Sequence, residues 1–167
     1  ASDLPTMQAC FDQLAEFDIS FEANVLSAHR TPNETIAYVK DAEKRGCQVF
    51  IAAAGMAAHL AGAVAAQTIK PVIGVPLPGG LQNGLDALLS TVQMPGGTPV
   101  ACMAVGRAGA KNAAVFATEI MAINSAVVAS KLTGARQKKS GFFGERQSNF
   151  TAGISSNCIM VVRIIHG

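Results

Sequence analysis

The stretch CQVFIAAAGMAAHLAG, residues 47–62, carries the pattern on which the fold prediction rests. Its first half, 47–54, is an unbroken apolar run, which is typical of a strand buried on both faces of a parallel sheet. Its second half is rich in Ala and predicts a small-residue helix from about Met56 to Thr68. The stretch therefore reads as a strand followed by a helix that packs against it.

The same alternation extends to both sides of this unit. Further strands are expected at 20–27, 71–76, 100–106 and 158–165, and helices at 4–17, 31–45, 84–93 and 110–132. Such alternation indicates a parallel sheet with helices on both faces, joined by right-handed crossovers. Residues 133–157 are rich in Gly, Ser, Asn and basic side chains and are predicted as a linker or mobile segment. We expect one α/β domain over 1–132, completed by a strand within 158–167.

Two helix starts carry capping signals. Ser2 or Asp3 is expected to cap the first helix. Thr31 and Glu34 match a capping box, with Pro32 at the first helical position.

The composition limits the class of protein. The chain has 167 residues, of which 50% are hydrophobic and 14% are charged, so one domain with a real core is expected. So low a charged fraction also suggests that much of the surface is buried in an oligomer. The apolar segments are too short to span a membrane, and no signal-peptide pattern is present.

The cysteines and the charges narrow the class further. The four cysteines have no CxxC spacing, which favours buried free thiols in a reducing cytoplasm. The net charge is +2. Five basic residues and one acidic residue lie in 131–146, which leaves 8 basic and 10 acidic residues elsewhere, a net −2. The excess of basic over acidic residues therefore lies in one segment, 131–146, and it gives no support for nucleic-acid binding.

The densest cluster of reactive side chains is SAHRTP, residues 27–32, between a predicted strand and a predicted helix. A helix N-terminus attracts anions, and Arg30 can bind a phosphate in a bidentate fashion. His29 can transfer protons near neutral pH. The alternative is a solvated Arg30 beside a histidine that only forms a turn.

A second histidine, His59, follows the buried strand at 47–54. The carboxyl ends of parallel strands form the ligand crevice in sheets of this kind, so His29 and His59 are expected to share one edge. The alternative for His59 is a core histidine bonded to backbone. Two glycine-rich loops, 77–84 and 94–99, either cover a bound ligand or are ordinary turns. There is no metal-ligand spacing and no dinucleotide or P-loop motif, so neither a metal nor a cofactor is expected.

Six motifs together resemble the PurE family of purine biosynthesis, the 5-(carboxyamino)imidazole ribonucleotide mutases. They stand in the family's order and spacing from Ser2 to about Leu132 and read SDLPTM (2–7), SAHRTP (27–32), AGMAAHLAG (54–62), PVIGVPL (71–77), GLDALLSTVQMPGGTPV (84–100) and GRAGAKNA (106–113). The family usually has Gly where Met56 stands and Pro where Ala61 stands.

The resemblance implies a flavodoxin-like, three-layer αβα fold and a homo-octamer acting on a small ribonucleotide. It implies that a carboxylate moves from the exocyclic nitrogen to a ring carbon, with His29 as the acid and then the base. The other residues that it places at the substrate are Ser2, Asp3, Ser27, Ala28, Arg30, Gly55, Ala57, Ala58, His59, Leu60 and Gly167.

The resemblance also gives a meaning to the segment IMVVRIIHG, 159–167. Family members begin with a short apolar strand that ends in Gly-Ser-x-Ser-Asp. Placed before Ala1, the segment reads IIHG–ASDLPTM, which is that opening less one serine. A circular permutation is therefore expected, with an interior strand at 158–165 and Gly167 close to Ala1. The alternative is an unrelated edge strand. His166 stands where the family usually has an apolar residue.

Two other functions stay open from the sequence. One is the family's other branch, a carboxylase that adds free carbon dioxide to aminoimidazole ribonucleotide; AAHL at 57–60 resembles the mutase branch. The other is a flavodoxin-like binding module without catalysis.

Overall fold

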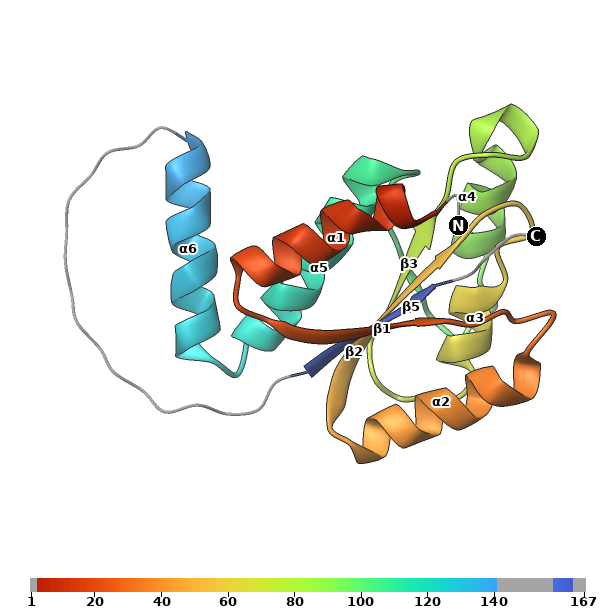
Figure 1. The fold of residues 1–167 in the computed structure, drawn as a ribbon, viewed down its shortest axis with the longest axis horizontal. Helices are drawn as coiled ribbons and strands as arrows, with labels where there is room; N and C mark the ends of the chain where they lie inside the picture. The colour runs from red at the N-terminus through yellow and green to blue at the C-terminus, as the bar shows by residue number, and fades with distance from the viewer. Residues whose placement is uncertain (1–2, 141–157, 164–167) are drawn as a thin grey trace.

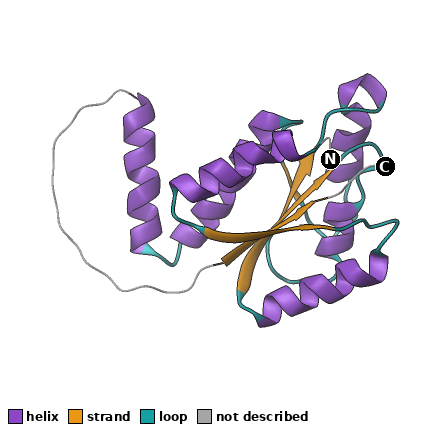
Figure 2. Ribbon diagram, viewed as in Figure 1, coloured by secondary structure: helices purple, strands orange, loops and turns teal. Residues whose placement is uncertain are grey.

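The computed structural model describes residues 3–140 and 158–163. Over these residues helices and strands alternate, as the sequence predicts (Figures 1 and 2). The elements are α1 Leu4–Glu16, β1 Ser20–Val25, α2 Pro32–Lys44, β2 Cys47–Ala54, α3 Leu60–Ala65, β3 Val72–Pro76, the 3-10 turn η1 Leu81–Asn83, α4 Leu85–Val92, β4 Ala101–Cys102, α5 Arg107–Ala122, α6 Ala126–Ser140 and β5 Cys158–Arg163.

The five strands form one parallel sheet in the order β1-β5-β2-β3-β4. β5 lies between β1 and β2, and its Val161 stands opposite Ala23 on one side and Ile51 on the other. The predicted interior strand is confirmed over 158–163, and the alternative of an edge strand is wrong. If β5 is counted first, the order becomes 2-1-3-4-5, which is that of flavodoxin-like folds. The expected closeness of Gly167 and Ala1 lies outside the described residues.

Two apolar cores lie on opposite faces of the sheet, and β2 serves both. Val49 and Ile51 of β2 face α1 and α5, whereas Phe50 and Ala52 face α2 and α3. This alternation follows from the period of two along a strand, and it explains why all of 49–54 is buried and apolar. The two helical layers are visible in Figure 1.

The side-chain caps predicted at Asp3 and at Thr31 are wrong. Asp3 is the residue before α1, but its side chain makes no capping hydrogen bond, and Ser2 lies outside the described residues. Thr31 does not cap α2 with its side chain either. Its hydroxyl instead donates to the carbonyl of Ser27 at 3.2 Å and accepts from the Ser27 amide at 2.9 Å. A hydroxyl engaged in this turn is not available to the helix.

The helix predicted at 110–132 consists of two helices. α5 ends at Ala122 and α6 begins at Ala126, where the Ser125 hydroxyl accepts from the amide of Val128 at 3.4 Å. α6 then continues to Ser140, so residues 133–140 are helical rather than part of a linker. Arg136 pairs with Glu119 of α5, which ties this basic segment to the domain. Residues 141–157 lie outside the described part of the chain.

Two further elements are shorter than predicted. The helix expected from Met56 begins only at Leu60, because Met56 has a left-handed backbone with φ 53°. The strand expected at 100–106 is regular only at Ala101–Cys102, although the Met103 amide still donates to Gly74 at 2.8 Å. No helix within the described residues is both long and apolar enough to cross a bilayer.

Candidate functional site

The candidate site lies at the carboxyl edge of the sheet, where β1, β5 and β2 end side by side. The loops beyond β2, β3 and β4 are joined there by backbone hydrogen bonds. The Leu77 amide donates to the carbonyl of Ala54 at 2.8 Å, and the Gly106 amide donates to that of Pro76 at 2.9 Å. These bonds give the edge a fixed backbone frame on which side chains can be placed.

His29 and His59 meet at this edge, as the sequence predicts. The Nε2 atom of His29 lies 2.8 Å from Nδ1 of His59, which is a hydrogen bond between two imidazoles. The rings are nearly perpendicular, at 86°, with centroids 4.9 Å apart. Both side chains are exposed, so they can reach a bound molecule. The alternative of a core histidine is wrong for His59.

A network of hydroxyl groups holds the turn that carries His29. The Ser27 carbonyl accepts from the Thr31 amide at 3.0 Å and from the hydroxyls of Thr31 and Thr35 at 3.2 and 3.4 Å. The Ser27 hydroxyl accepts from the Arg30 amide at 3.2 Å. The turn is thus fixed independently of any ligand. Thr31 and Thr35 were not among the predicted site residues, although their spacing of four on one helix face could have indicated a shared partner.

The turn that carries His59 is formed by backbone conformation. Gly55 is buried, and Met56 turns the chain with its left-handed φ while its side chain is 51% exposed. The His59 amide then donates to the carbonyl of Ala57 at 2.8 Å, and the His59 carbonyl accepts from Ala63 within α3. The imidazole makes no cap hydrogen bond and is instead bonded to His29.

The other predicted site residues fall into three groups. Ala58 and Leu60 are 1% and 0% exposed and belong to the core under α3, so their side chains support the wall from behind. Asp3 is 6% exposed, and Ser27 and Ala28 are half-buried. Ala57 and Arg30 are exposed, and Ser2 and Gly167 lie outside the described residues.

Asp86 organises the glycine-rich loop 77–84 that follows β3. Its carboxylate accepts from the amides of Leu81 at 3.1 Å and Ala87 at 2.9 Å. Gly80 has a φ of 61°, which side-chain-bearing residues rarely adopt, and a Cβ there would lie 2.3 Å from the Asp86 Oδ2 atom, so this position favours glycine. The loop is therefore a defined structure next to the carboxyl edge. Asp86 was missed because one acidic residue in a first helical turn is a common feature.

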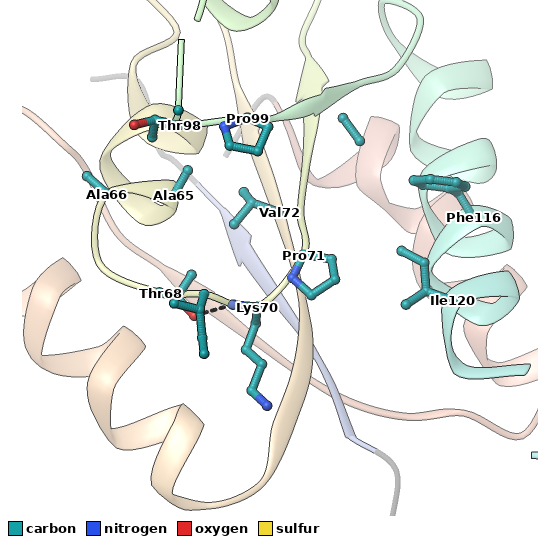
Figure 3. Close-up of a pocket in the computed structure, with 13 residues that line it drawn as sticks. Ala65, Ala66, Thr68, Lys70, Pro71, Val72, Thr98, Pro99, Phe116 and Ile120 are labelled. Atoms are coloured by element: carbon teal, nitrogen blue, oxygen red, sulfur yellow. Dashed lines mark hydrogen bonds between the residues drawn. The ribbon is translucent and has the colours of Figure 1, made fainter. Parts of the chain in front are cut away.

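A cavity of about 620 Å³ lies elsewhere in the molecule (Figure 3). Its wall includes Pro71 and Val72 at the amino end of β3, Pro99, and Phe116 and Ile120 of α5. None of the predicted site residues lines it. Ligands of open α/β sheets bind at the carboxyl ends of strands, so this cavity is not the predicted crevice.

The acid–base groups available for chemistry are few. Over the described residues, no three His, Cys, Asp or Glu side chains gather in a way that could hold a metal ion. Burial raises the pKa of the Cys10 thiol to about 12, and burial also raises the pKa of Cys102. A thiol with a raised pKa is a poor nucleophile at neutral pH. The histidine pair is the arrangement at this edge best suited to proton transfer.

Comparison with known proteins agrees with the predicted PurE resemblance. The family model described as AIR carboxylase (AIRC) matches residues 1–141. An N5-carboxyaminoimidazole ribonucleotide mutase of Brucella melitensis biotype 1 is 46% identical over 148 residues, which cover 89% of this chain and 91% of the relative. One of Saccharolobus solfataricus is 53% identical over 131 residues, which cover 78% and 82%.

Solved structures agree in fold. The crystal structure of Treponema denticola PurE superposes with a TM-score of 0.74 at 24% identity, covering 84% of this chain and 87% of that one. The flavodoxin-like α/β architecture that the resemblance implied is therefore confirmed. On the match over residues 1–141 and the relatives of 46–53% identity, this chain belongs to the AIR carboxylase (AIRC) family.

Proposed function

We propose that this chain is a mutase of purine biosynthesis that converts 5-(carboxyamino)imidazole ribonucleotide into 4-carboxy-5-aminoimidazole ribonucleotide. The observation that carries the proposal is the His29–His59 pair at the carboxyl edge, in a chain 46% identical to a named mutase over 89% of its length. The pair supplies the acid–base group that the reaction needs.

The reaction requires one proton to be delivered and another to be removed. Breakdown of the carbamate needs a proton at the exocyclic nitrogen, and carboxylation of the ring carbon needs that carbon to lose a proton. His29 performs both steps, as acid and then as base. Its exposed ring, in the turn between β1 and α2, is accessible to a bound substrate.

The remaining residues of the edge bind and enclose the substrate. Arg30 binds the ribose phosphate together with Ser2 and Asp3, and Ser27 and Ala28 line the same turn. Gly55 and Ala57 present backbone to the carboxylate, and Ala58 and Leu60 make the wall behind it apolar. An apolar wall keeps water away from the carbon dioxide released midway. Gly167 is proposed as a further substrate-binding residue.

A mutational test separates proton transfer from binding. His29→Asn should keep ligand affinity and lower turnover by about a hundredfold or more, as expected when a general acid–base is removed. Arg30→Ala should mainly weaken binding, by roughly 1.5–3 kcal/mol. Turnover is followed spectroscopically and affinity by calorimetry. Near-normal turnover of His29→Asn would place the proton transfer elsewhere.

A carboxylase that uses free carbon dioxide is the second candidate, because the matching family model is described as AIR carboxylase. The two activities are separated by the substrate. The mutase should turn over the carboxyamino ribonucleotide without added bicarbonate. Turnover only of aminoimidazole ribonucleotide with bicarbonate would identify the carboxylase instead.

We propose a homo-octamer in the cytoplasm, where Cys10 and Cys102 stay reduced. α4 exposes an apolar stripe of Leu85, Leu89 and Val92, which are 36%, 47% and 50% exposed. A second apolar surface includes Ile69, in the loop between α3 and β3, and Phe116 of α5, which are 98% and 37% exposed and line one cavity. Two such surfaces support contacts of two kinds, which a closed assembly larger than a dimer needs.

Light scattering should report eight subunits, and Leu89→Lys should give a smaller species. Ala15→Lys, at an exposed position of α1 outside both apolar surfaces, is the matched surface change and should leave a larger assembly than Leu89→Lys does. A stable monomer of the unmodified chain at micromolar concentration would contradict the octamer.

We also infer that the chain is circularly permuted, with β5 in the place of the family's first strand. The support is that β5 lies outside the family match yet fills the interior position that gives the 2-1-3-4-5 order. A rearranged chain that places 158–167 before Ala1 and stops after Ser140 should fold with similar stability. Failure of that chain to fold would contradict the permutation.

A further inference from the structure

The hydrogen bond between His29 and His59 limits which ring atom can meet a substrate. Nε2 of His29 is engaged with Nδ1 of His59 at 2.8 Å, so Nδ1 is the ring nitrogen that His29 has left for a ligand. A bond between two imidazole nitrogens needs one proton on one of them and a lone pair on the other. The protonation of His59 is therefore coupled to the tautomer of His29.

We propose that His59 is a positioning residue that sets the tautomer of His29 and takes part in its proton transfer, so that Nδ1 of His29 alternates between acid and base. The inference rests on the proposed mutase function. It assigns to the His59 side chain a task in each half of the reaction, in addition to its place at the pocket wall.

In its charged form the pair holds three ring protons. His29 carries one on Nδ1, and His59 carries one on each nitrogen, so its Nδ1–H donates to the bare Nε2 of His29. The Nδ1 proton of His29 then moves to the exocyclic nitrogen of the substrate. At the same time the Nδ1 proton of His59 crosses the hydrogen bond to His29. The carbon–nitrogen bond of the carbamate breaks, its electron pair stays on nitrogen, and carbon dioxide is released.

The neutral pair that remains is prepared for the second half of the reaction. Each ring now carries its proton on Nε2, and Nδ1 of His29 is a base. After the ring carbon has bonded to carbon dioxide, Nδ1 takes the proton of that carbon, whose electron pair returns to the ring. His29 passes its Nε2 proton back to His59, which restores the charged pair. One proton leaves the pair and one returns, so the cycle needs no further reactant.

The geometry allows His59 to be changed without disturbing the fold. Its side chain is exposed and makes no cap hydrogen bond, whereas the core under α3 consists of Leu60, Ala61 and Val64. His59→Asn and His59→Ala form a matched pair of variants. The amide oxygen of Asn can accept from Nε2–H of His29 but cannot relay a proton, and Ala can do neither.

The experiment combines ring ¹⁵N spectra of histidine-labelled protein with steady-state kinetics. In the unmodified chain and in His59→Asn, neutral His29 should be in the Nε2–H tautomer, and in His59→Ala it should be a tautomer mixture. Both variants should lower kcat by at least about tenfold with KM little changed, because the relay is lost in each.

Two results would overturn the inference. One is a His29 spectrum that is the same in His59→Ala as in the unmodified chain, since His59 would then not set the tautomer. The other is a near-normal kcat for His59→Asn, since orientation alone would then be enough. If the unmodified chain turns over neither ribonucleotide, the proposed function fails, and the ¹⁵N spectra still decide whether the pair is coupled.

Discussion

Gly109, in the first turn of α5, should tolerate no side chain. A Cβ there would lie 1.6 Å from the carbonyl oxygen of Ala104 and 2.6 Å from its carbon. Contacts of this kind normally lie beyond about 3 Å, so backbone would have to move by more than roughly 1 Å. The displaced helix carries Ala110 and Ala113, both 0% exposed in the core. Gly109→Ala should therefore lower the free energy of unfolding by about 3 kcal/mol or more.

A second helical glycine provides the control. A Cβ on Gly134, in α6, would meet no atom within 4 Å. Gly134→Ala should raise stability by about 0.5–1 kcal/mol, since Ala is the better helix former. Urea denaturation measures the change in the free energy of unfolding for both variants. In thermal unfolding, the Tm should fall by about 6 °C or more for Gly109→Ala and rise by a few degrees for Gly134→Ala. Equal effects of the two substitutions would refute the argument from close approach at Ala104.

Three further predictions follow from single side chains. Met56→Gly should raise the free energy of unfolding by about 0.5–1 kcal/mol, because glycine adopts the left-handed backbone without strain; a decrease in thermal stability would contradict this. Glu22→Gln should destabilise the protein at neutral pH, because the Arg45 guanidinium, which donates to both Glu22 oxygens at 2.7 and 2.8 Å, lowers the pKa of that carboxyl. A lowered pKa of the Glu22 carboxyl stabilises the fold above its unfolded-state pKa, and this stabilisation is lost as the pH falls through the native pKa. The destabilisation caused by Glu22→Gln should therefore disappear in acid. A destabilisation that does not change with pH would refute this prediction. Cys10 is 0% exposed and burial raises its pKa to about 12, so it should react with a thiol reagent at pH 8 only on unfolding. Half-buried Cys102, whose pKa burial also raises, should react slowly but in the native state; equal rates would contradict this.

The elements that the sequence predicted well are those in which burial and pattern agree. β2 was predicted at 47–54 and found at Cys47–Ala54, because Gly46 ends the preceding helix and every position from Val49 onward is buried. The break between α5 and α6 was missed because apolar residues stand on both sides of it, at 121–123 and 126–128, and only Asn124 and Ser125 separate them. The signal was Ser125, whose hydroxyl accepts from the third amide after it. The helical part of the predicted linker was missed because one of its basic residues, Arg136, pairs with Glu119 of α5, which lies outside the segment.

The candidate site was predictable in its location and less so in its contacts. Parallel strands bring the loops after β1 and β2 to one edge, so the neighbourhood of His29 and His59 followed from the alternation of elements. Their direct hydrogen bond depends on side-chain rotamers and on the left-handed turn at Met56, which local pattern does not encode. The capping box at Thr31 failed for a related reason, since a three-dimensional partner, the backbone of Ser27, competed with the local one.

The central position of β5 also affects how the chain folds. Its partners, β1 at Ser20–Val25 and β2 at Cys47–Ala54, lie more than a hundred residues earlier in the chain. During synthesis, every other described element emerges first, and β1 then has no strand to pair with among them. Contacts so distant in sequence slow folding, and unpaired strand edges promote aggregation while they persist. The sheet of this protein therefore closes only after residues 158–163 have been made, and its demand for chaperones should be greatest before they emerge.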